Sequence, residues 1–145
     1  MKKGFTLLEL MIVIVIIGLL STVALLAYRS SLEKARGAEA RMVLGNMRSM
    51  CGGLFSRDGS TDSCTADNLL IGAGQGKVPG PAASQCRQSN FFWYNVSQAT
   101  ADRVTFVATR CVGAAGKQPG GDVPAQNLTL TINFSSGLDS WSGDY

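Results

Sequence analysis

A long apolar run near the N-terminus, interrupted by a single charge, places the strongest constraint on how this chain can fold. From Gly4 to Leu20 the sequence reads GFTLLELMIVIVIIGLL, and its one charged residue is Glu9. A charge at the centre of a hydrocarbon layer costs about 3 kcal/mol on insertion scales, and such residues usually have a partner. The question for the whole chain is therefore what pairs with Glu9.

The uncharged stretch over residues 10–28 is close to the roughly 20 residues that a helix needs to cross a bilayer. Basic residues flank it on both sides, with Lys3 before it and Arg29 after it, so the charge bias leaves its orientation open. A cleaved secretory signal would need small residues at a cut site, and residues 21–27 offer them loosely. The charge of Glu9 argues against such a signal, and an ordinary membrane anchor leaves Glu9 unexplained.

The residues around this charge resemble the processing site of type IV pilins and of the pseudopilins of type II secretion. In that family a Gly is followed by Phe, by Glu at the fifth position of the mature chain, and by a long apolar helix. Gly4, Phe5 and Glu9 occupy those positions here. The resemblance implies that a prepilin peptidase cuts between Gly4 and Phe5, removes residues 1–4 as a leader, and leaves Phe5 to be N-methylated.

Cleavage at this position would also supply a partner for Glu9. The new amine on Phe5 stays cationic and lies about one helical turn from Glu9 in the same chain. When the helices of several subunits stack with an axial stagger, the amine of one subunit can meet Glu9 of its neighbour. An apolar core tolerates a paired charge but not an unpaired one, so we expect Glu9 to set the register of stacking.

The attraction between subunits would come from the apolar surface itself, at about 25 cal/mol for each Å² buried. Gly18 stands where the family often has glycine, and we expect it to take part in assembly with Phe5 and Glu9. Leu26 stands where many members carry a proline in the middle of the helix.

Composition limits what the remainder of the chain can be. Its 145 residues leave room for one small domain after the anchor. Loss of Lys2 and Lys3 with the leader would take the Lys and Arg count from 13 to 11, against 10 acidic residues. This balance gives no reason to expect direct, specific nucleic-acid binding. Histidine is absent and no catalytic constellation stands out, so we expect no enzyme, no cofactor and no metal site.

The helix is predicted to continue beyond the membrane with one apolar stripe. Apolar residues recur there at spacings near three and four, the period of an amphipathic helix. They are Leu32, Ala35, Met42, Val43, Met47, Met50 and Leu54. Glycine often lies at a helix C-terminus, so Gly52 and Gly53 are predicted to end the helix. Its two halves are then residues 5–28, apolar all round, and residues 29–54, amphipathic.

The rest of the chain predicts a loop followed by strands. Residues 55–90 are rich in Gly, Ser, Asp and Pro, which indicates a loop. Strands are predicted at residues 91–96, 104–109 and 127–134, followed by a polar tail. We therefore expect an α+β fold in which the long N-terminal helix packs against a small antiparallel sheet, with residues 55–145 as a globular head. That arrangement resembles the pilin head.

Four cysteines lie outside the anchor, in a part of the chain expected to be outside the cytoplasm, where disulfides form. Four cysteines allow three pairings. Cys86 and Cys111 flank two predicted strands that meet near Thr100, so a hairpin would bring them together, and Cys51 and Cys64 would then close the loop that leaves the helix. The sequence favours the pairs Cys51–Cys64 and Cys86–Cys111, while the other pairings stay open. Zinc binding is disfavoured because no CxxC spacing is present.

The resemblance implies a structural subunit of a bacterial filament, held in the inner membrane and then transferred to a periplasmic or extracellular filament. The expected partners are identical or related pilin subunits, the prepilin peptidase and the inner-membrane assembly platform. A type IV pilus, serving adhesion, twitching motility or DNA uptake, is favoured over a type II secretion pseudopilus. A membrane-anchored binding protein that never polymerises is the third alternative.

Overall fold

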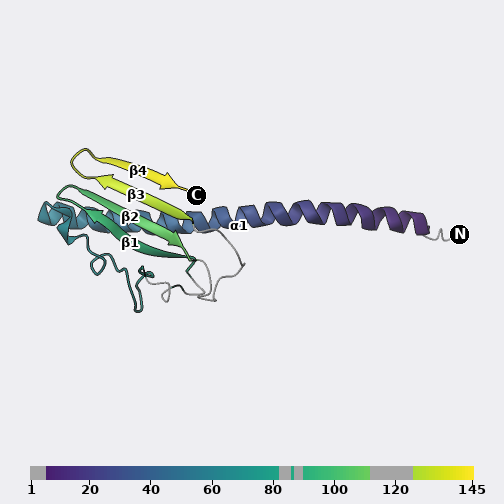
Figure 1. The fold of residues 1–145 in the computed structure, drawn as a ribbon, viewed down its shortest axis with the longest axis horizontal. Coiled ribbons are helices and arrows are strands. Elements are labelled where there is room, and N and C mark those ends of the chain that lie inside the picture. Colours follow the sequence, from purple (N-terminus) through teal and green to yellow (C-terminus); the bar gives the residue numbers. More distant parts are fainter. Residues whose placement is uncertain (1–5, 82–85, 87–89, 112–125) are drawn as a thin grey trace. The chain divides into compact units, whose positions relative to one another are not determined.

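The computed structural model describes residues 6–81, 86, 90–111 and 126–145. These residues form the helix α1 (Leu7–Asp58), the short 3-10 helix η1 (Thr61–Ser63), and the strands β1 (Phe92–Ala99), β2 (Arg103–Arg110), β3 (Asn127–Asn133) and β4 (Leu138–Gly143), as Figure 1 shows. The chain divides into two compact units, Met1–Ala35 and Arg36–Tyr145. The predicted α+β class, one long N-terminal helix with a small antiparallel sheet, is confirmed.

The first unit is helical from Leu7 onward, and none of its residues from 6 to 31 is buried. The hydroxyls of Ser21 and Thr22 donate to the carbonyls of Ile17 and Leu19, at 2.7 Å in each case. The polar groups inside the apolar segment are therefore satisfied within the helix itself. The helix is unbroken at Leu26, whose side chain is 71% exposed.

The second unit is built around a sheet whose strand order follows the sequence, β1-β2-β3-β4, with every neighbouring pair antiparallel. In β2 and β3 buried side chains alternate with less buried ones, which is the pattern of a sheet with one face on a core. That face packs on the C-terminal part of α1 (Figure 1). The core residues are Ala40, Leu44, Met47 and Cys51 from the helix, Cys64, Leu69 and Ile71 from the segment that follows it, and Phe92, Tyr94, Val104, Phe106, Ala108, Leu128, Leu130 and Ile132 from the sheet.

The predicted apolar stripe of the helix is partly wrong. The buried helix residues are Gly37, Ala40, Leu44, Met47 and Cys51. Met42, which the sequence placed on the stripe, is 68% exposed, because it is two residues from Ala40 and so lies about 200° around the helix from it. Val43, Met50 and Leu54 pack at the margin of the core.

The predicted end of the helix at Gly52 and Gly53 is also wrong, since α1 continues to Asp58. Gly59 follows with a φ of +70°, and its N–H donates to the carbonyl of Phe55 at 2.8 Å, which is a glycine cap. The ring of Phe55 stacks on Phe134 with centroids 4.6 Å apart. This packing on the sheet helps to hold the last turns that two internal glycines would otherwise weaken.

The predicted polar tail is a fourth strand. Leu138–Gly143 forms β4 at the edge of the sheet and pairs with β3, with Trp141 opposite Leu130. The turn before it is fixed by the side-chain oxygen of Asn133, which accepts from the backbone N–H groups of Ser135 at 3.0 Å and Ser136 at 3.1 Å. Asparagine, serine and glycine in such a turn are a hairpin signal, and here they join β3 to β4.

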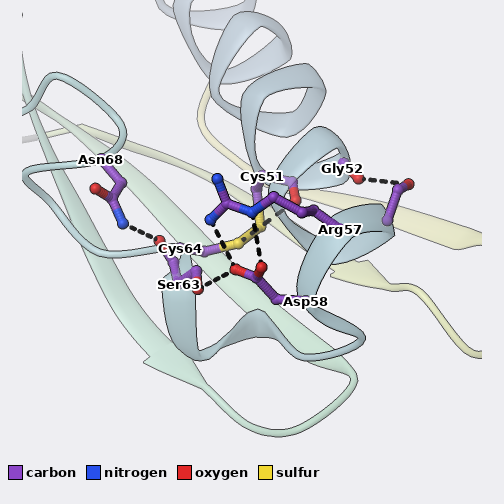
Figure 2. A network of polar contacts seen from close by, with 8 residues as sticks. Cys51, Gly52, Arg57, Asp58, Ser63, Cys64 and Asn68 are labelled. Atoms are coloured by element: carbon purple, nitrogen blue, oxygen red, sulfur yellow. Dashed lines mark hydrogen bonds and ion pairs between the residues drawn. A yellow bond between two sulfur atoms is a disulfide. The ribbon is translucent and has the colours of Figure 1, made fainter.

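The two disulfides of the structure are Cys51–Cys64 and Cys86–Cys111, the pairing that the sequence favours. The first ties the last turns of α1 to the loop beyond η1, and Figure 2 shows it beside a network of polar contacts. In that network Asp58 accepts from Arg57 at 2.7 and 2.9 Å and from the hydroxyl of Ser63. The disulfide and these hydrogen bonds therefore tie the end of α1 to the segment that follows it.

Candidate assembly segment and its capping carboxylate

The start of α1 is a reciprocal cap formed by Thr6 and Glu9. The N–H of Glu9 donates to the hydroxyl of Thr6 at 3.3 Å, while the carboxylate Oε2 accepts from the Thr6 N–H at 3.3 Å and from its hydroxyl at 3.1 Å. The carbonyl of Thr6 accepts the first helical hydrogen bond, from Leu10 at 3.3 Å. This is a capping box, in which two N–H groups that the helix leaves unpaired are satisfied by each other's side chains.

The cap corrects one step of the sequence argument. An ordinary membrane anchor does have a use for Glu9, because its carboxylate completes the helix start and lies at the favourable, positive end of the helix dipole. Within the residues that the structure describes, the hydrogen bonds of this carboxylate all go to Oε2. Since a carboxylate has two acceptor oxygens, Oε1 is left for a donor from elsewhere.

The surface that follows the cap is apolar and exposed. It includes every large apolar side chain from Leu7 to Tyr28, each more than 40% exposed. The segment is long and apolar enough to cross a membrane, and none of its most apolar window is buried. Soluble proteins rarely expose contiguous apolar patches larger than a few hundred Å², so this surface needs a cover of lipid or of other protein.

Gly4, Phe5 and Gly18 are the other residues predicted to act in processing or assembly. Gly4 and Phe5 lie outside the described residues, so their cleavage and methylation stay a prediction. Gly18 lies inside α1, and a Cβ added to it would meet no heavy atom within 4 Å. Sequence reasoning overlooked Thr6, although the pattern Thr-x-x-Glu directly before an apolar run is the signature of a capping box.

A separate group of polar side chains lies in the second unit, between helix and sheet. The side chain of Arg110 is buried, donates to the carbonyl of Phe91 at 2.9 Å, and lies over the rings of Phe91 and Phe92. Burial raises the pKa of Glu39, and the charge of Arg110 offsets part of that rise. Burial and, to a lesser extent, Glu39 raise the pKa of Tyr94. Where the helix meets the sheet, the charges of Glu39 and Arg110 therefore offset each other, and Tyr94 stays neutral.

No group of three or more His, Cys, Asp or Glu side chains is placed to hold a metal ion in the described part of the chain.

Comparison with known proteins gives matches that cover part of the chain. The prokaryotic N-terminal methylation motif matches residues 1–25. Fimbrial protein EcpC of Eikenella corrodens is 41% identical over 71 residues, which are 49% of this chain and 44% of that protein. A fimbrial protein of Moraxella nonliquefaciens is 56% identical over 39 residues, 27% of this chain and 25% of the relative. The type IV major pilin protein PilE1 of Neisseria gonorrhoeae is 47% identical over 49 residues, 34% of this chain and 30% of the relative.

The matched part thus spans less than half the length of each of these relatives. No solved structure matches the chain.

The fold and the apolar start of α1 define a class of protein. Its members have a long N-terminal helix that is exposed and apolar after a capped start, and an α+β head that includes the end of that helix. The methylation motif and the fimbrial relatives make the assignment more specific. The N-terminal part of the chain is similar to prepilins: it matches the methylation motif and resembles fimbrial proteins and type IV pilins.

Proposed function

We propose that this chain is a structural, non-enzymatic subunit of a type IV pilus-like filament. It enters the inner membrane through α1, loses residues 1–4 to a prepilin peptidase, and is N-methylated on Phe5. The inner-membrane assembly platform then adds it to a filament, in which the apolar half of α1 packs against the same helix in identical or related subunits.

The observation that carries this proposal is the exposed apolar surface of α1, which begins at a carboxylate whose Oε1 accepts no hydrogen bond from any described residue. Lipid covers such a surface before assembly, and neighbouring helices cover it afterwards. Oε1 of Glu9 accepts from the Phe5 amine of the next subunit while Oε2 keeps the cap. The pair formed by Glu9 of one subunit and the Phe5 amine of the next fixes the axial register. A neighbouring helix shifted along the filament axis would leave the Glu9 carboxylate unpaired in an apolar core.

Two substitutions separate the capping role of Glu9 from its proposed pairing role. Glu9→Gln keeps an acceptor for the cap, since Gln also serves at this position of a capping box, but removes the negative charge. Thr6→Ala removes the cap at a cost of about 1 kcal/mol and keeps the charge. We expect Glu9→Gln to reach the membrane normally and form few filaments, and Thr6→Ala to assemble at close to the normal level. The measurement is the amount of sheared filament relative to membrane-bound subunit.

Normal filament yield from Glu9→Gln, together with loss of filaments from Thr6→Ala, would show that the carboxylate acts only as a cap. The matched control is Ser21→Ala, which removes another internal hydrogen bond of the same segment without changing a charge.

Processing is tested at the leader. Replacing Gly4 with leucine is expected to leave residues 1–4 attached, and the mass of the membrane-bound subunit would show it. A mature N-terminus at Phe5 in that variant would contradict the proposed cleavage site. The wild-type subunit supplies the control, with a mass expected to match a methylated Phe5.

The alternative machine is a type II secretion pseudopilus. The names of the relatives, which are fimbrial and pilin proteins, favour the pilus. Electron microscopy of a deletion strain distinguishes the two machines: loss of surface filaments is expected for a pilus subunit, for which adhesion, twitching and DNA uptake are then assayed separately. A secretion defect with surface filaments intact would favour the pseudopilus.

A membrane-anchored binding protein that never polymerises is the third alternative. It predicts that Glu9→Gln leaves ligand binding intact. It also predicts that crosslinking between α1 helices yields no products larger than those expected from random collisions in the membrane.

A further inference from the structure

The outer face of the sheet, which points away from α1, carries a hollow at the β3–β4 hairpin whose lining residues are mostly of polar type. The strand register places Arg103, Asn133 and Leu138 opposite one another across β2, β3 and β4. Thr131 and Ser140 form part of the next row. Directly opposed residues in an antiparallel sheet share a face, and the neighbours on the other face, Val104 and Ile132, are buried in the core.

Among the described residues, Arg103 is the one cation that lines this hollow, and its side chain makes no hydrogen bond or ion pair with any of them. Asp139 borders the hollow, but it is opposite the buried Ile132, on the face that packs on α1, and its carboxylate accepts there from Nε of Arg48. The unbalanced charge of the hollow is therefore that of one exposed guanidinium, which is always protonated and presents a planar fork of donors.

Neutral hydrogen-bonding groups surround this guanidinium. The oxygen of the Asn133 amide is used by the turn, where it accepts from Ser135 and Ser136, so its NH₂ group is left to donate outward. Thr131 shares one hydrogen bond with Thr105 at 3.2 Å, and a hydroxyl has capacity for more. Ser140 adds a second hydroxyl on exposed β4, and Leu138, 71% exposed, adds an apolar wall.

We propose that this hollow binds an acidic sugar, a ring bearing one carboxylate and several hydroxyls. The guanidinium of Arg103 takes the carboxylate through two parallel hydrogen bonds, a geometry that carboxylates favour. The amide of Asn133 and the hydroxyls of Thr131 and Ser140 meet the ring hydroxyls, and Leu138 contacts the apolar ring face. The hollow has a volume of about 420 Å³, near the lower end of the range for small-molecule sites, which suits a single sugar.

The charge pattern favours this ligand over a nucleic acid. Affinity for a phosphate backbone comes from several cations that each neutralise a phosphate, whereas this hollow offers one. The site lies entirely within the second unit, so the proposal does not rest on filament assembly. In a filament the same weak site would be repeated along the surface, and repetition raises the strength of attachment to a polymer of acidic sugars.

The test uses the full chain in a polyoxyethylene detergent, because glucoside and maltoside detergents would themselves present sugar. Sodium glucuronate is titrated while NMR follows the Nε–H of Arg103 and the side-chain NH₂ of Asn133. We expect saturable shifts at millimolar glucuronate, and glucose at the same concentrations should produce none. Arg103→Gln should weaken the affinity about tenfold or more, since a hydrogen bond to a charged group is worth about 1.5–3 kcal/mol. Arg29→Gln, which removes the same charge outside the hollow, should leave the affinity unchanged.

A second variant guards against a folding defect in Arg103→Gln. Ser140→Tyr fills the hollow from an exposed strand, where an aromatic residue is well accommodated, and should also abolish the shifts. Unchanged binding in both variants, or equal binding of glucose and glucuronate, would overturn the proposal. Tighter binding of a thymidine oligonucleotide than of glucuronate, with a steep loss in salt, would overturn it in favour of a nucleic-acid site.

Discussion

At the scale of single residues, Glu9 has a partner in its own chain, Thr6, that was not predicted from the sequence. The charge in the apolar run identified it, because any charge there needs an explanation. The partner that was not predicted is Thr6. Its hydrogen bonds to Glu9 are local, and the Thr-x-x-Glu spacing indicates them. Pairing with another subunit cannot be read from one chain, since it depends on how chains stack.

Two glycines of α1 give opposite expectations on substitution by alanine. A Cβ on Gly37 would lie 2.5 Å from Cδ1 of Tyr145, whose ring also packs edge-to-face on Phe92, so Gly37→Ala should destabilise the head by about 1–3 kcal/mol. Gly45 has open space around it, so Gly45→Ala should be neutral or stabilise by up to about 1 kcal/mol. Denaturant unfolding followed by near-ultraviolet circular dichroism checks both, and equal effects would contradict the packing of Tyr145.

Asp58 is expected to titrate unusually low. The hydrogen bond from Arg57, reinforced by that from Ser63, lowers the pKa of Asp58 from 3.8 to about 2. Because the folded-state pKa is depressed, the contribution of Asp58 to stability is present above about pH 4 and is lost as the pH falls towards 2. Arg57→Gln should move the pKa of Asp58 upwards, as measured from its carboxyl chemical shift against pH.

At the scale of elements, periodicity predicted that a helix would be present and what its type would be, but not its buried face or its end. The apolar residues after Arg36 are frequent enough that two different stripes fit them, and the sheet selects the one through Leu44 and Met47. The helix end was missed because Gly52 and Gly53 are weak breakers when Phe55, beyond them, has a ring to stack on. The edge strand β4 was missed because all of its side chains are exposed.

The choice of stripe can be tested with two large side chains two residues apart. Leu44 is completely buried, so Leu44→Ala should cost about 2–5 kcal/mol of unfolding free energy. Met42→Ala, at a mostly exposed position of the same helix, should stay within about 0.5 kcal/mol. Chemical unfolding in detergent gives both values. If Met42→Ala were the more damaging of the two, the face predicted from sequence would be the buried one after all.

At the scale of the whole molecule, the two units differ in whether they bury their own apolar side chains. None of the described residues of the first unit is buried, so its apolar surface needs a cover of lipid or of other protein. The second unit has its own apolar core and two disulfides. Composition and patterning predicted an exposed apolar helix and a sheet, because an apolar segment and an alternating strand pattern are both local signals. The predicted head began at residue 55, whereas the second unit begins at Arg36 and includes the C-terminal part of α1. The disulfide pairing was predictable from the expected hairpin, whereas the hollow beside Arg103 depends on strand register and was not.

The disulfide at the end of α1 should carry measurable stability. It closes a loop of 13 residues, for which the chain-entropy account gives about 3 kcal/mol. Replacing both Cys51 and Cys64 with alanine is expected to lower the unfolding free energy by about that amount in non-reducing buffer. Wild type treated with a reductant loses both bridges and should fall below the double variant. A double variant as stable as wild type would show that the Asp58 network and the core hold the helix end without the bridge.

The strand order has a consequence for how the head forms. Each strand of the sheet pairs with its neighbour in the sequence, so the sheet can be built one hairpin at a time without bringing distant segments together first. Closing a short loop costs less chain entropy than closing a long one, so a sheet built from short-range pairings folds faster. The head can therefore complete its sheet from short-range pairings, and the fold then brings the cysteines of each disulfide together.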